Sequence, residues 1–270
     1  MPTCEKDMSQ VQNCRSQSKR FVIDSLARCG STALARVLPL CGRITCLIEP
    51  FHPARYNGQY HKLVGNSESL RTILDMIWLR WNGIKHVWVP PEGFPFEGRQ
   101  FLNDELVLRA DAIIFLKRKN CLQRYVSSVL SRRLKFWIGA KQEYRFRLER
   151  MGFPELSVEV ARKAIAEDRS AIERRELLLS SRDANVHIVY YEDLFGDTVT
   201  QQAQAAQINT ILCFLGYSPV PQEITQSKQW NEIMNQGLCK WNSRDTYERI
   251  PGVLELERRI GSDETGWLLH

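Results

Sequence analysis

The sequence lacks the residue patterns of several common classes of protein. Although the chain contains eight cysteines, it has no C-x-x-C pair and no other spacing typical of a zinc site. Cysteines without such a pattern are usually reduced thiols, as in the cytoplasm. No apolar stretch reaches the roughly 20 residues that a membrane-spanning helix needs, and the polar N-terminal segment has no signal-peptide core. We therefore expect a soluble, cytoplasmic protein that does not bind membranes.

Two catalytic motifs are also missing. The Walker A pattern G-x-x-x-x-G-K-[ST], typical of P-loop kinases and ATPases, is absent. The zinc-protease pattern H-E-x-x-H is absent as well, and the five histidines do not cluster with carboxylates along the chain. We therefore expect no metal, and a chemistry other than that of a Walker-type kinase.

The remaining composition is that of an ordinary globular protein. With 270 residues, of which 43% are hydrophobic, the chain is long enough for one large domain. The net charge of +6 is modest for this length and favours anionic ligands rather than nucleic acid. The charge is unevenly distributed, because the segment from Lys117 to Arg147 holds ten Lys and Arg residues and a single acid, Glu143.

Short apolar runs alternate with segments of helical periodicity. We expect strands at 21–26, 43–49, 83–89, 110–118 and 186–191, and helices at 31–40, 67–81, from about 120, 156–180, 199–215 and about 252–260. Strands separated by helices are typical of βαβ units, which form a mainly parallel sheet with helices on both faces. The sequence predicts one α/β domain over residues 20–270, with a flexible tail at 1–19 and a largely irregular segment at 220–270.

The segment A-R-C-G-S-T-A-L at 27–34 follows the first expected strand directly. A helix N-terminus offers unpaired N–H groups and the positive end of the helix dipole, so it favours anions. Gly30 lets the backbone approach a phosphate, Ser31 and Thr32 can donate hydrogen bonds, and Arg28 supplies a charged fork. From the residues alone, a phosphate loop and a capped helix with an incidental arginine are equally good interpretations.

The segment 111–128 repeats this arrangement. A buried strand ends in the cations Lys117, Arg118 and Lys119, and the helix that follows carries Ser127 about two turns in. A second phosphate could bind to Arg118 or Lys119 and the Ser127 hydroxyl. The alternative is a solvated basic helix face, which is the usual meaning of such a charge run.

Together these segments resemble the sulfotransferases that use 3′-phosphoadenosine 5′-phosphosulfate. The stretch Arg28-Cys29-Gly30-Ser31-Thr32, followed by Ala33, resembles their 5′-phosphosulfate loop, and Lys117 to Ser127 resembles their 3′-phosphate motif. The stretch Y-Y-E-D-L at 190–194 is similar to a third motif, which the resemblance places near the adenine through Tyr191. The likeness spans residues 20–217, and it implies a P-loop-like domain with the sulfate donor as co-substrate and no metal.

Two positions depart from the family pattern. The family serine usually follows the phosphate-binding arginine by eight residues, whereas Ser127 follows Arg118 by nine and Lys119 by eight. Because arginine is the better fork for phosphate, Arg118 is the first candidate and Lys119 the second. Cys29 stands where the family more often has serine or proline, which matters little if the backbone N–H is the group used.

The resemblance also suggests catalytic residues. Arg28 and Lys85 would stabilise charge on the leaving phosphate, and a base must take the proton of the acceptor. Glu49 corresponds to the glutamate base of a trehalose-sulfating bacterial branch, and His52 lies in the same turn. Cytosolic relatives use a histidine two residues after the strand lysine, a position that is Val87 here. Glu49 is the first candidate for the base, and the alternative is that it serves as a helix N-cap or forms a surface ion pair.

The acceptor should be chosen by the loops 50–66, 90–104 and 134–150. They carry the aromatic residues Phe51, Tyr56, Tyr60, Phe94, Phe96, Phe136, Trp137 and Tyr144. Such residues line pockets for ring-bearing or cationic small molecules, although each of them is at least as suited to packing on the core. We expect a specialised metabolite that accepts sulfate on a hydroxyl or a nitrogen, as in bacterial sulfotransferases of toxin biosynthesis such as the saxitoxin type.

Two other functions remain open. A small-molecule kinase could share the architecture, but the Walker lysine is missing and the second basic segment would have no role. An RNA-binding protein could use the basic helix with its interleaved aromatic residues, since single-strand binders combine basic grooves with stacking rings. The sequence carries no RNA-binding motif, however, so we expect no nucleic-acid partner.

Overall fold

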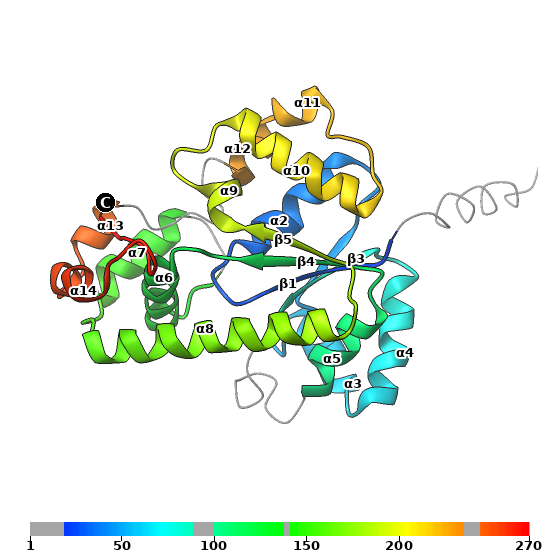
Figure 1. Ribbon diagram of the computed structural model, residues 1–270, viewed down its shortest axis with the longest axis horizontal. Helices are drawn as coiled ribbons and strands as arrows, with labels where there is room; N and C mark the ends of the chain where they lie inside the picture. Colours follow the sequence, from blue (N-terminus) through cyan, green and yellow to red (C-terminus); the bar gives the residue numbers. More distant parts are fainter. Residues whose placement is uncertain (1–18, 89–99, 138–140, 235–243, 270) are drawn as a thin grey trace, which may run out of the picture.

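The structure is a computed structural model that describes residues 19–88, 100–137, 141–234 and 244–269. A single five-stranded sheet lies at its centre (Figure 1). Its strands are β1 (Phe21–Ser25), β2 (Cys46–Ile48), β3 (Gly83–Val87), β4 (Ala112–Lys117) and β5 (Val186–Tyr190). The strand order is β2-β3-β1-β4-β5 and every pair is parallel. The predicted α/β fold with a parallel sheet is confirmed, whereas nearly all of the predicted tail lies outside the described residues.

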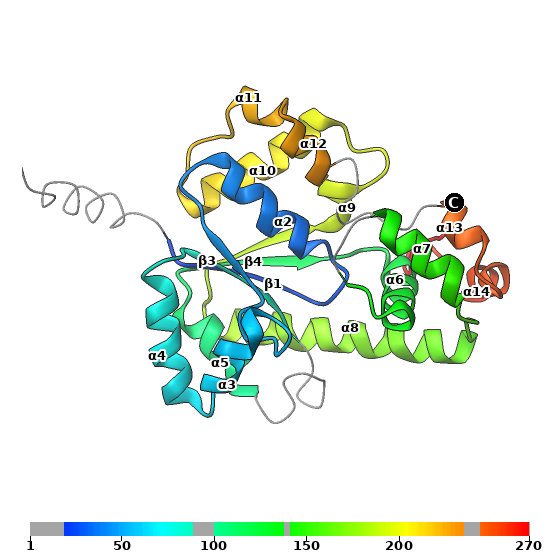
Figure 2. The same cartoon turned by 180° about the vertical axis from the view of Figure 1, so that it is seen from behind.

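Helices cover both faces of this sheet, as Figures 1 and 2 show from opposite sides. One face carries α2 (Ser31–Val37) with its 3₁₀ extension η1 (Leu38–Cys41), α9 (Tyr191–Phe195), α10 (Gln201–Leu215), α11 (Gln222–Thr225) and α12 (Lys228–Met234). The other face carries η2 (Tyr56–Gly58), α3 (Gln59–Leu63), α4 (Ser67–Trp78), α5 (Gln100–Arg109) and α8 (Val158–Ser181). The sheet is therefore the middle of three layers.

A further group of helices, called here the fourth helix group because it follows the three layers, lies beyond the carboxyl ends of the strands (Figure 1). It consists of α6 (Cys121–Leu134), α7 (Lys141–Met151), α13 (Arg244–Glu248) and α14 (Val253–Ile260), packed on the far half of α8. These elements bury an apolar cluster of their own, separate from the clusters on the two faces of the sheet. This apolar cluster therefore lies next to the carboxyl edge of the sheet, which is the edge where ligands bind in open α/β folds.

The central strand is β1, and all five of its residues are buried. After β1 the chain crosses one face through α2 to reach β2, whereas the connections after β2, β3 and β4 cross the opposite face through α4, α5 and α8 (Figures 1 and 2). The carboxyl end of β1 therefore lies where neighbouring connections diverge, which is the point in an open parallel sheet that most often binds ligands.

Several predicted segments differ in the structure. The predicted loop 134–150 contains most of α7, because Tyr144 and Leu148, one turn apart, are buried against the core of the fourth helix group. The segment 220–270 is more helical than predicted, since it contains α11, α12 and α13 besides the expected α14. These short helices are fixed by long-range packing, for example of the buried Trp230 and Tyr247, which local periodicity does not reveal.

Other boundaries follow the prediction closely. Helix α10 ends at Gly216, which adopts a left-handed conformation with φ 83°, as a C-terminal glycine does. Helix α4 begins at the predicted residue 67 and is capped by Asn66 in a reciprocal capping box with Ser69. Within the described part of the chain, no helix has the length and apolarity needed to cross a bilayer.

Candidate functional site

The turn after β1 has an unusual backbone. Arg28 has φ 70° and Gly30 has φ 84°, both in the left-handed region, and Gly30 forms the N-cap of α2. The ring of Tyr191 lies directly on this glycine, because a Cβ atom at position 30 would come within 2.7 Å of Tyr191 Cδ2. Only glycine fits there, and the first and third predicted motifs are in contact.

The side chain of Arg28 reaches the second motif. Its Nε donates a hydrogen bond to Ser127 Oγ at 3.0 Å, and its Nη1 donates to the carbonyl of Trp137 at 3.4 Å. Ser127 is 4% exposed and points from α6 toward the turn. The two predicted phosphate motifs therefore meet at one place through their side chains.

Arg118 lies beside the same turn. Its Nη1 donates to the carbonyl oxygen of Arg28 at 3.0 Å and its Nη2 donates to Gln123 Oε1 at 2.9 Å. The guanidinium also stacks over the ring of Tyr191, 4.2 Å from its centroid. Its Nε is buried and makes no hydrogen bond within the described residues, although the Glu192 carboxylate lies 4.0 Å away. Arg118 is thus the cation that faces the loop.

Lys119 has a different environment. Its side chain is 55% exposed, forms an ion pair with Asp193 at 3.1 Å and lies over the ring of Tyr190. The sequence left Arg118 and Lys119 open as partners of Ser127. Their exposures and contacts favour Arg118 for an enclosed ligand.

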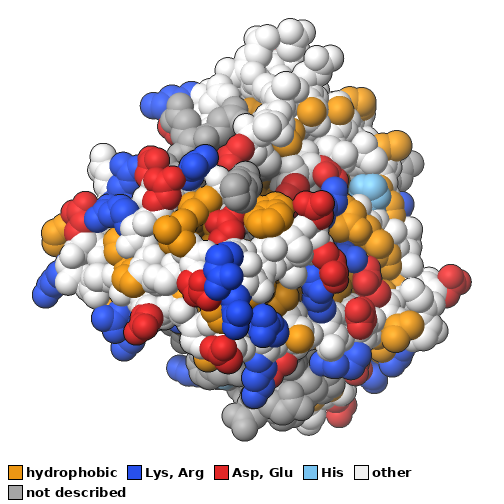
Figure 3. All heavy atoms as spheres, turned by 60° about the vertical axis from the view of Figure 1, so that its left-hand side comes forward, with side chains coloured by type: hydrophobic (Ala, Val, Ile, Leu, Met, Phe, Trp, Pro, Cys, Tyr) orange, Lys and Arg blue, Asp and Glu red, His pale blue; other side chains and the backbone are white. Residues whose placement is uncertain are grey.

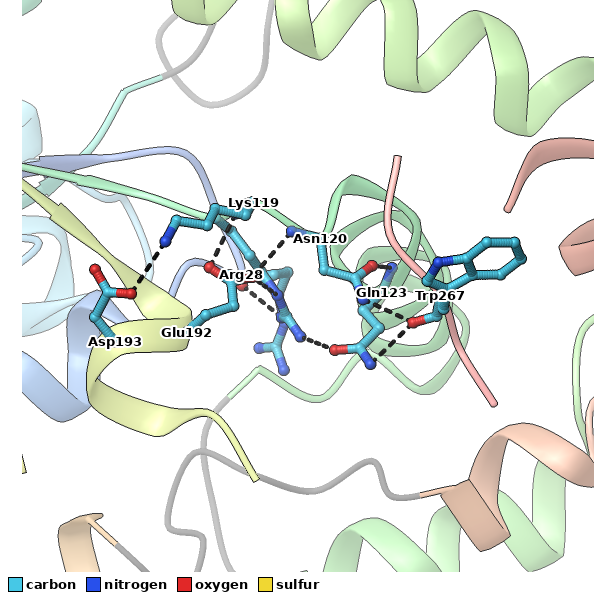
Figure 4. A network of polar contacts seen from close by, with 8 residues as sticks. Arg28, Lys119, Asn120, Gln123, Glu192, Asp193 and Trp267 are labelled. Carbon is cyan, nitrogen blue, oxygen red and sulfur yellow. Dashed lines mark hydrogen bonds and ion pairs between the residues drawn. The ribbon is translucent and has the colours of Figure 1, made fainter. Parts of the chain in front are cut away.

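The N–H groups just before α6 are bound by a carboxylate. Glu192 accepts hydrogen bonds from the backbone N–H of Lys119 at 3.0 Å and of Asn120 at 2.9 Å (Figure 4). The side-chain amides of Asn120 and Gln123 both donate to the carbonyl of Trp267, so the C-terminal segment lies against the start of α6. The sequence gave no role to this segment or to Glu192. A ligand at this edge would use the arginine side chains rather than the two N–H groups that Glu192 occupies.

The turn at 27–30 is also held by a hydrogen bond from Arg124 and by the burial of Cys29. Arg124 on α6 pairs with Asp168 on α8 and donates to the carbonyl of Ala27 at 3.3 Å. Cys29 is 1% exposed, and burial raises the pKa of its thiol, which remains protonated at neutral pH. The side chain of Cys29 is therefore packed inward, which leaves its backbone as the part that can meet a ligand.

A second constellation forms at the ends of β2 and β3. Lys85 is 2% exposed and donates to Glu49 Oε1, and the backbone N–H of Glu49 donates to the Lys85 carbonyl at 2.8 Å. Glu49 adopts φ 49°, in the left-handed region, and its Oε2 lies 3.7 Å from Arg55. A non-glycine residue held in this conformation is one of the forms of backbone strain that gather at functional sites.

The protonation state of Glu49 follows from its neighbours. Burial by itself would raise the pKa of this carboxyl, but the Lys85 ammonium, together with Arg55, outweighs burial and holds the pKa below its usual range. Glu49 is therefore ionised at neutral pH. That is the state a general base requires, although the lowered pKa also makes it a weaker base.

The histidines near this pair differ in position. His52 donates its backbone N–H to the Glu49 carbonyl at 3.1 Å, and its ring Nδ1 accepts from the N–H of Ala54. Burial lowers the pKa of His52. His86 Nε2 lies 2.7 Å from Asn103 Oδ1, on the opposite face of the sheet from Lys85, because successive side chains of a strand alternate between faces.

A buried ion pair lies under β1 that the sequence did not single out. Asp24 is fully buried and accepts from Arg175 Nε on α8 at 2.8 Å. Removing one member of such a pair costs about 3–5 kcal/mol, because the other charge is left buried. The aspartate inside the apolar run of β1 was the available signal, since a charge on a central strand must find a partner. This pair fixes α8 against the sheet.

The predicted aromatic pocket is not assembled in the described residues. Phe51, Phe136 and Tyr144 are buried in the core, Tyr60 is half-buried, Tyr56 and Trp137 are exposed, and Phe94 and Phe96 lie outside the described residues. Core packing therefore accounts for the three buried rings. Trp137 is the exposed aromatic residue that contacts the loop, because its carbonyl accepts from Arg28.

Neither a metal centre nor a known relative identifies the site. Within the ranges that the structure describes, no three His, Cys, Asp or Glu side chains are grouped so that they could hold a metal ion. No family model, curated protein or solved structure matches the chain. The function therefore has to be argued from the geometry of the site.

Proposed function

We propose that the protein is a sulfotransferase that moves a sulfuryl group from 3′-phosphoadenosine 5′-phosphosulfate to a small molecule. The observation that carries this proposal is the hydrogen bond from Arg28 to Ser127, with Arg118 bound to the Arg28 carbonyl and stacked on Tyr191. Residues from three separate motifs converge at the carboxyl end of the central strand. Two arginines, a hydroxyl and an aromatic ring suit a phosphorylated nucleoside.

The donor would be held by the side chains of this cluster. Arg28 and the backbone of residues 29–33 would contact the 5′-phosphosulfate, and Arg118 with Ser127 would contact the 3′-phosphate. Tyr191, already stacked on Arg118, would lie near the adenine. The buried Nε of Arg118 lies 4.0 Å from the Glu192 carboxylate, and this ion pair orients the guanidinium beside the loop.

The transfer itself needs a base and a cation. The acceptor oxygen or nitrogen forms a bond to sulfur while the bond from sulfur to the 5′-phosphate oxygen breaks, and the phosphate leaves with the electron pair. Glu49, ionised because Lys85 lowers its pKa, would take the acceptor proton, with His52 as the second candidate. Lys85 and Arg28 would stabilise the charge on the departing phosphate.

The ion pair of Glu49 with Lys85 would also control the strength of the base. Glu49 binds Lys85 in the structure, so the ammonium is shared between the carboxylate and any anion that arrives. When Lys85 turns to a leaving phosphate, the pKa of Glu49 rises and the carboxylate becomes a stronger base. The acceptor is a small metabolite in this proposal, and the free thiols of the five described cysteines agree with action in the cytoplasm.

The proposal is tested by calorimetric titration of the protein with 3′,5′-adenosine bisphosphate, 5′-AMP and Mg²⁺-ATP. We expect micromolar binding that requires the 3′-phosphate. Equal binding of 5′-AMP would contradict the second phosphate site. Preference for Mg²⁺-ATP would favour a kinase, and salt-sensitive binding of an oligoribonucleotide instead would favour an RNA-binding protein.

A further inference from the structure

A second basic surface lies away from the candidate site. The end of the molecule that carries α13 and α14 comes forward in Figure 3, where Lys and Arg side chains gather among acidic ones. Here a groove of about 400 Å³ runs between α8, α14 and the turn that follows α14. This volume is within the range of small-molecule sites.

The lining of this groove combines charge with an apolar floor. It consists of Arg162, Ile165, Ala166, Arg169 and Ser170 of α8, Arg259 and Ile260 of α14, and Thr265 of the turn. The α8 residues recur at intervals of three and four positions, so they share one face of the helix. Three guanidinium groups and two hydroxyls thus surround a short apolar strip, and none of the lining side chains is acidic.

The three arginines of the groove already make hydrogen bonds and ion pairs, and the contacts of Arg162 and Arg259 are long. Arg169 is held by the Glu264 carboxylate at 2.6 Å and by the Glu264 carbonyl at 2.9 Å, so it is the least available of the three arginines. Arg162 donates to the Arg259 carbonyl at the long distance of 3.4 Å, and Arg259 Nε lies 3.7 Å from Glu255. An anion in the groove would meet a charge that these contacts neutralise only in part.

We infer that this groove is a second anion-binding site, one that takes an organic phosphate or sulfate ester with an apolar body. The oxyanion would bind the Arg162 and Arg259 guanidiniums, whose paired N–H groups can donate to two oxygens of one phosphate group. The apolar part would lie on Ile165, Ala166 and Ile260. This inference does not rest on the proposed sulfotransferase activity, because it concerns other helices and other side chains.

The experiment is a calorimetric titration of the full chain with 1-naphthyl phosphate, and with 1-naphthol as the neutral control. The test variant is Arg162→Ala/Arg259→Ala. Both side chains are exposed, so we expect the variant to fold as the wild type does. The matched control is Lys163→Ala/Arg174→Ala, which removes the same two charges from exposed positions of α8 outside the groove. Because the loop at 27–32 would also attract the probe, binding is read as the difference between variants.

We expect the naphthyl phosphate affinity to fall about tenfold or more in the groove variant and to stay within about twofold in the control. Equal weakening in both variants would mean attraction by net charge alone and would overturn the site. An unchanged affinity in the groove variant would do the same. Equal binding of 1-naphthol by the wild-type protein would show that the anion is not recognised, which also contradicts the inference.

Discussion

Arg28 Nε and Ser127 Oγ are joined by a 3.0 Å hydrogen bond, although the two residues are 99 positions apart in the chain. One follows the central strand β1 and the other lies on α6, after the neighbouring strand β4. This contact brings two arginine-bearing segments to one point at the carboxyl edge of the sheet. The proposed donor site depends on it.

Replacement of Arg28 by alanine should weaken donor binding. A hydrogen bond to a charged group contributes about 1.5–3 kcal/mol, so we expect the affinity for 3′,5′-adenosine bisphosphate to fall about 10- to 100-fold. Calorimetric titration measures this directly. The control is Arg43→Ala, an exposed arginine in the loop before β2, which removes the same charge. Equal losses in the two variants would show that Arg28 acts only through net charge.

Replacement of Glu49 by glutamine should abolish turnover and spare donor binding. The amide keeps the shape of the carboxyl but cannot take a proton, whereas the donor is bound by residues of other segments. Turnover with a candidate acceptor and titration with 3′,5′-adenosine bisphosphate separate the two effects. Normal turnover in this variant would rule out Glu49 as the base and leave His52 as the candidate.

The Glu49→Gln variant should also change how the free energy of unfolding depends on pH in the acid range. The pKa of Glu49 is lowered in the folded protein, so its ion pair with Lys85 stabilises the fold above the ordinary value of 4.5. That contribution is lost as the pH falls below 4.5 through the lowered pKa. Urea unfolding of the wild type should therefore show a steeper loss of stability in this range than unfolding of Glu49→Gln.

Replacement of Gly30 by alanine should destabilise the fold more than the same change at Gly216. Gly30 has φ 84° and Gly216 has φ 83°. An alanine in this left-handed conformation costs about 1–2 kcal/mol, and that cost is common to both variants. A Cβ at position 30 would also lie 2.7 Å from Tyr191, whereas nothing lies within 4 Å at position 216. We expect a further 1–3 kcal/mol at position 30, roughly the cost of overpacking.

Urea unfolding of the two glycine variants measures this difference. The Gly30→Ala change should cost less in a Tyr191→Ala background than in the wild type, because the ring that the new methyl group meets is then absent. Equal destabilisation of the two single variants would contradict the contact between the first and third motifs.

His86 should make the protein less stable as the pH falls from about 6.5 toward 4. Burial lowers the pKa of His86 from 6.5 to about 4, so between these values the unfolded chain binds a proton that the folded protein does not. The effect is at most about 3 kcal/mol for a difference of this size. Thermal unfolding between pH 4 and pH 7 should therefore depend on pH less steeply in His86→Gln than in the wild type. An unchanged slope would place the sensitivity in another group, such as the half-buried His187.

Much of the fold could be predicted from the sequence, and the reason is local. The strand predicted at 21–26 and the helices predicted at 156–180 and 199–215 follow from patterns of neighbouring residues, and all three elements are confirmed as β1, α8 and α10. Short helices such as α7 and α12 could not be predicted in this way. Their apolar residues are few, and they are helical because distant parts of the chain cover those residues.

The sequence by itself determined which residue types stand at the carboxyl ends of the strands, because strand alternation and chain order follow from composition and spacing. Only the tertiary structure decided which side chains meet there. It joined Arg28 to Ser127, turned Arg118 inward and Lys119 outward, and paired Glu49 with the buried Lys85. These contacts link strands and helices that are far apart in the chain, and the direction of each side chain depends on packing around it, which no local pattern encodes.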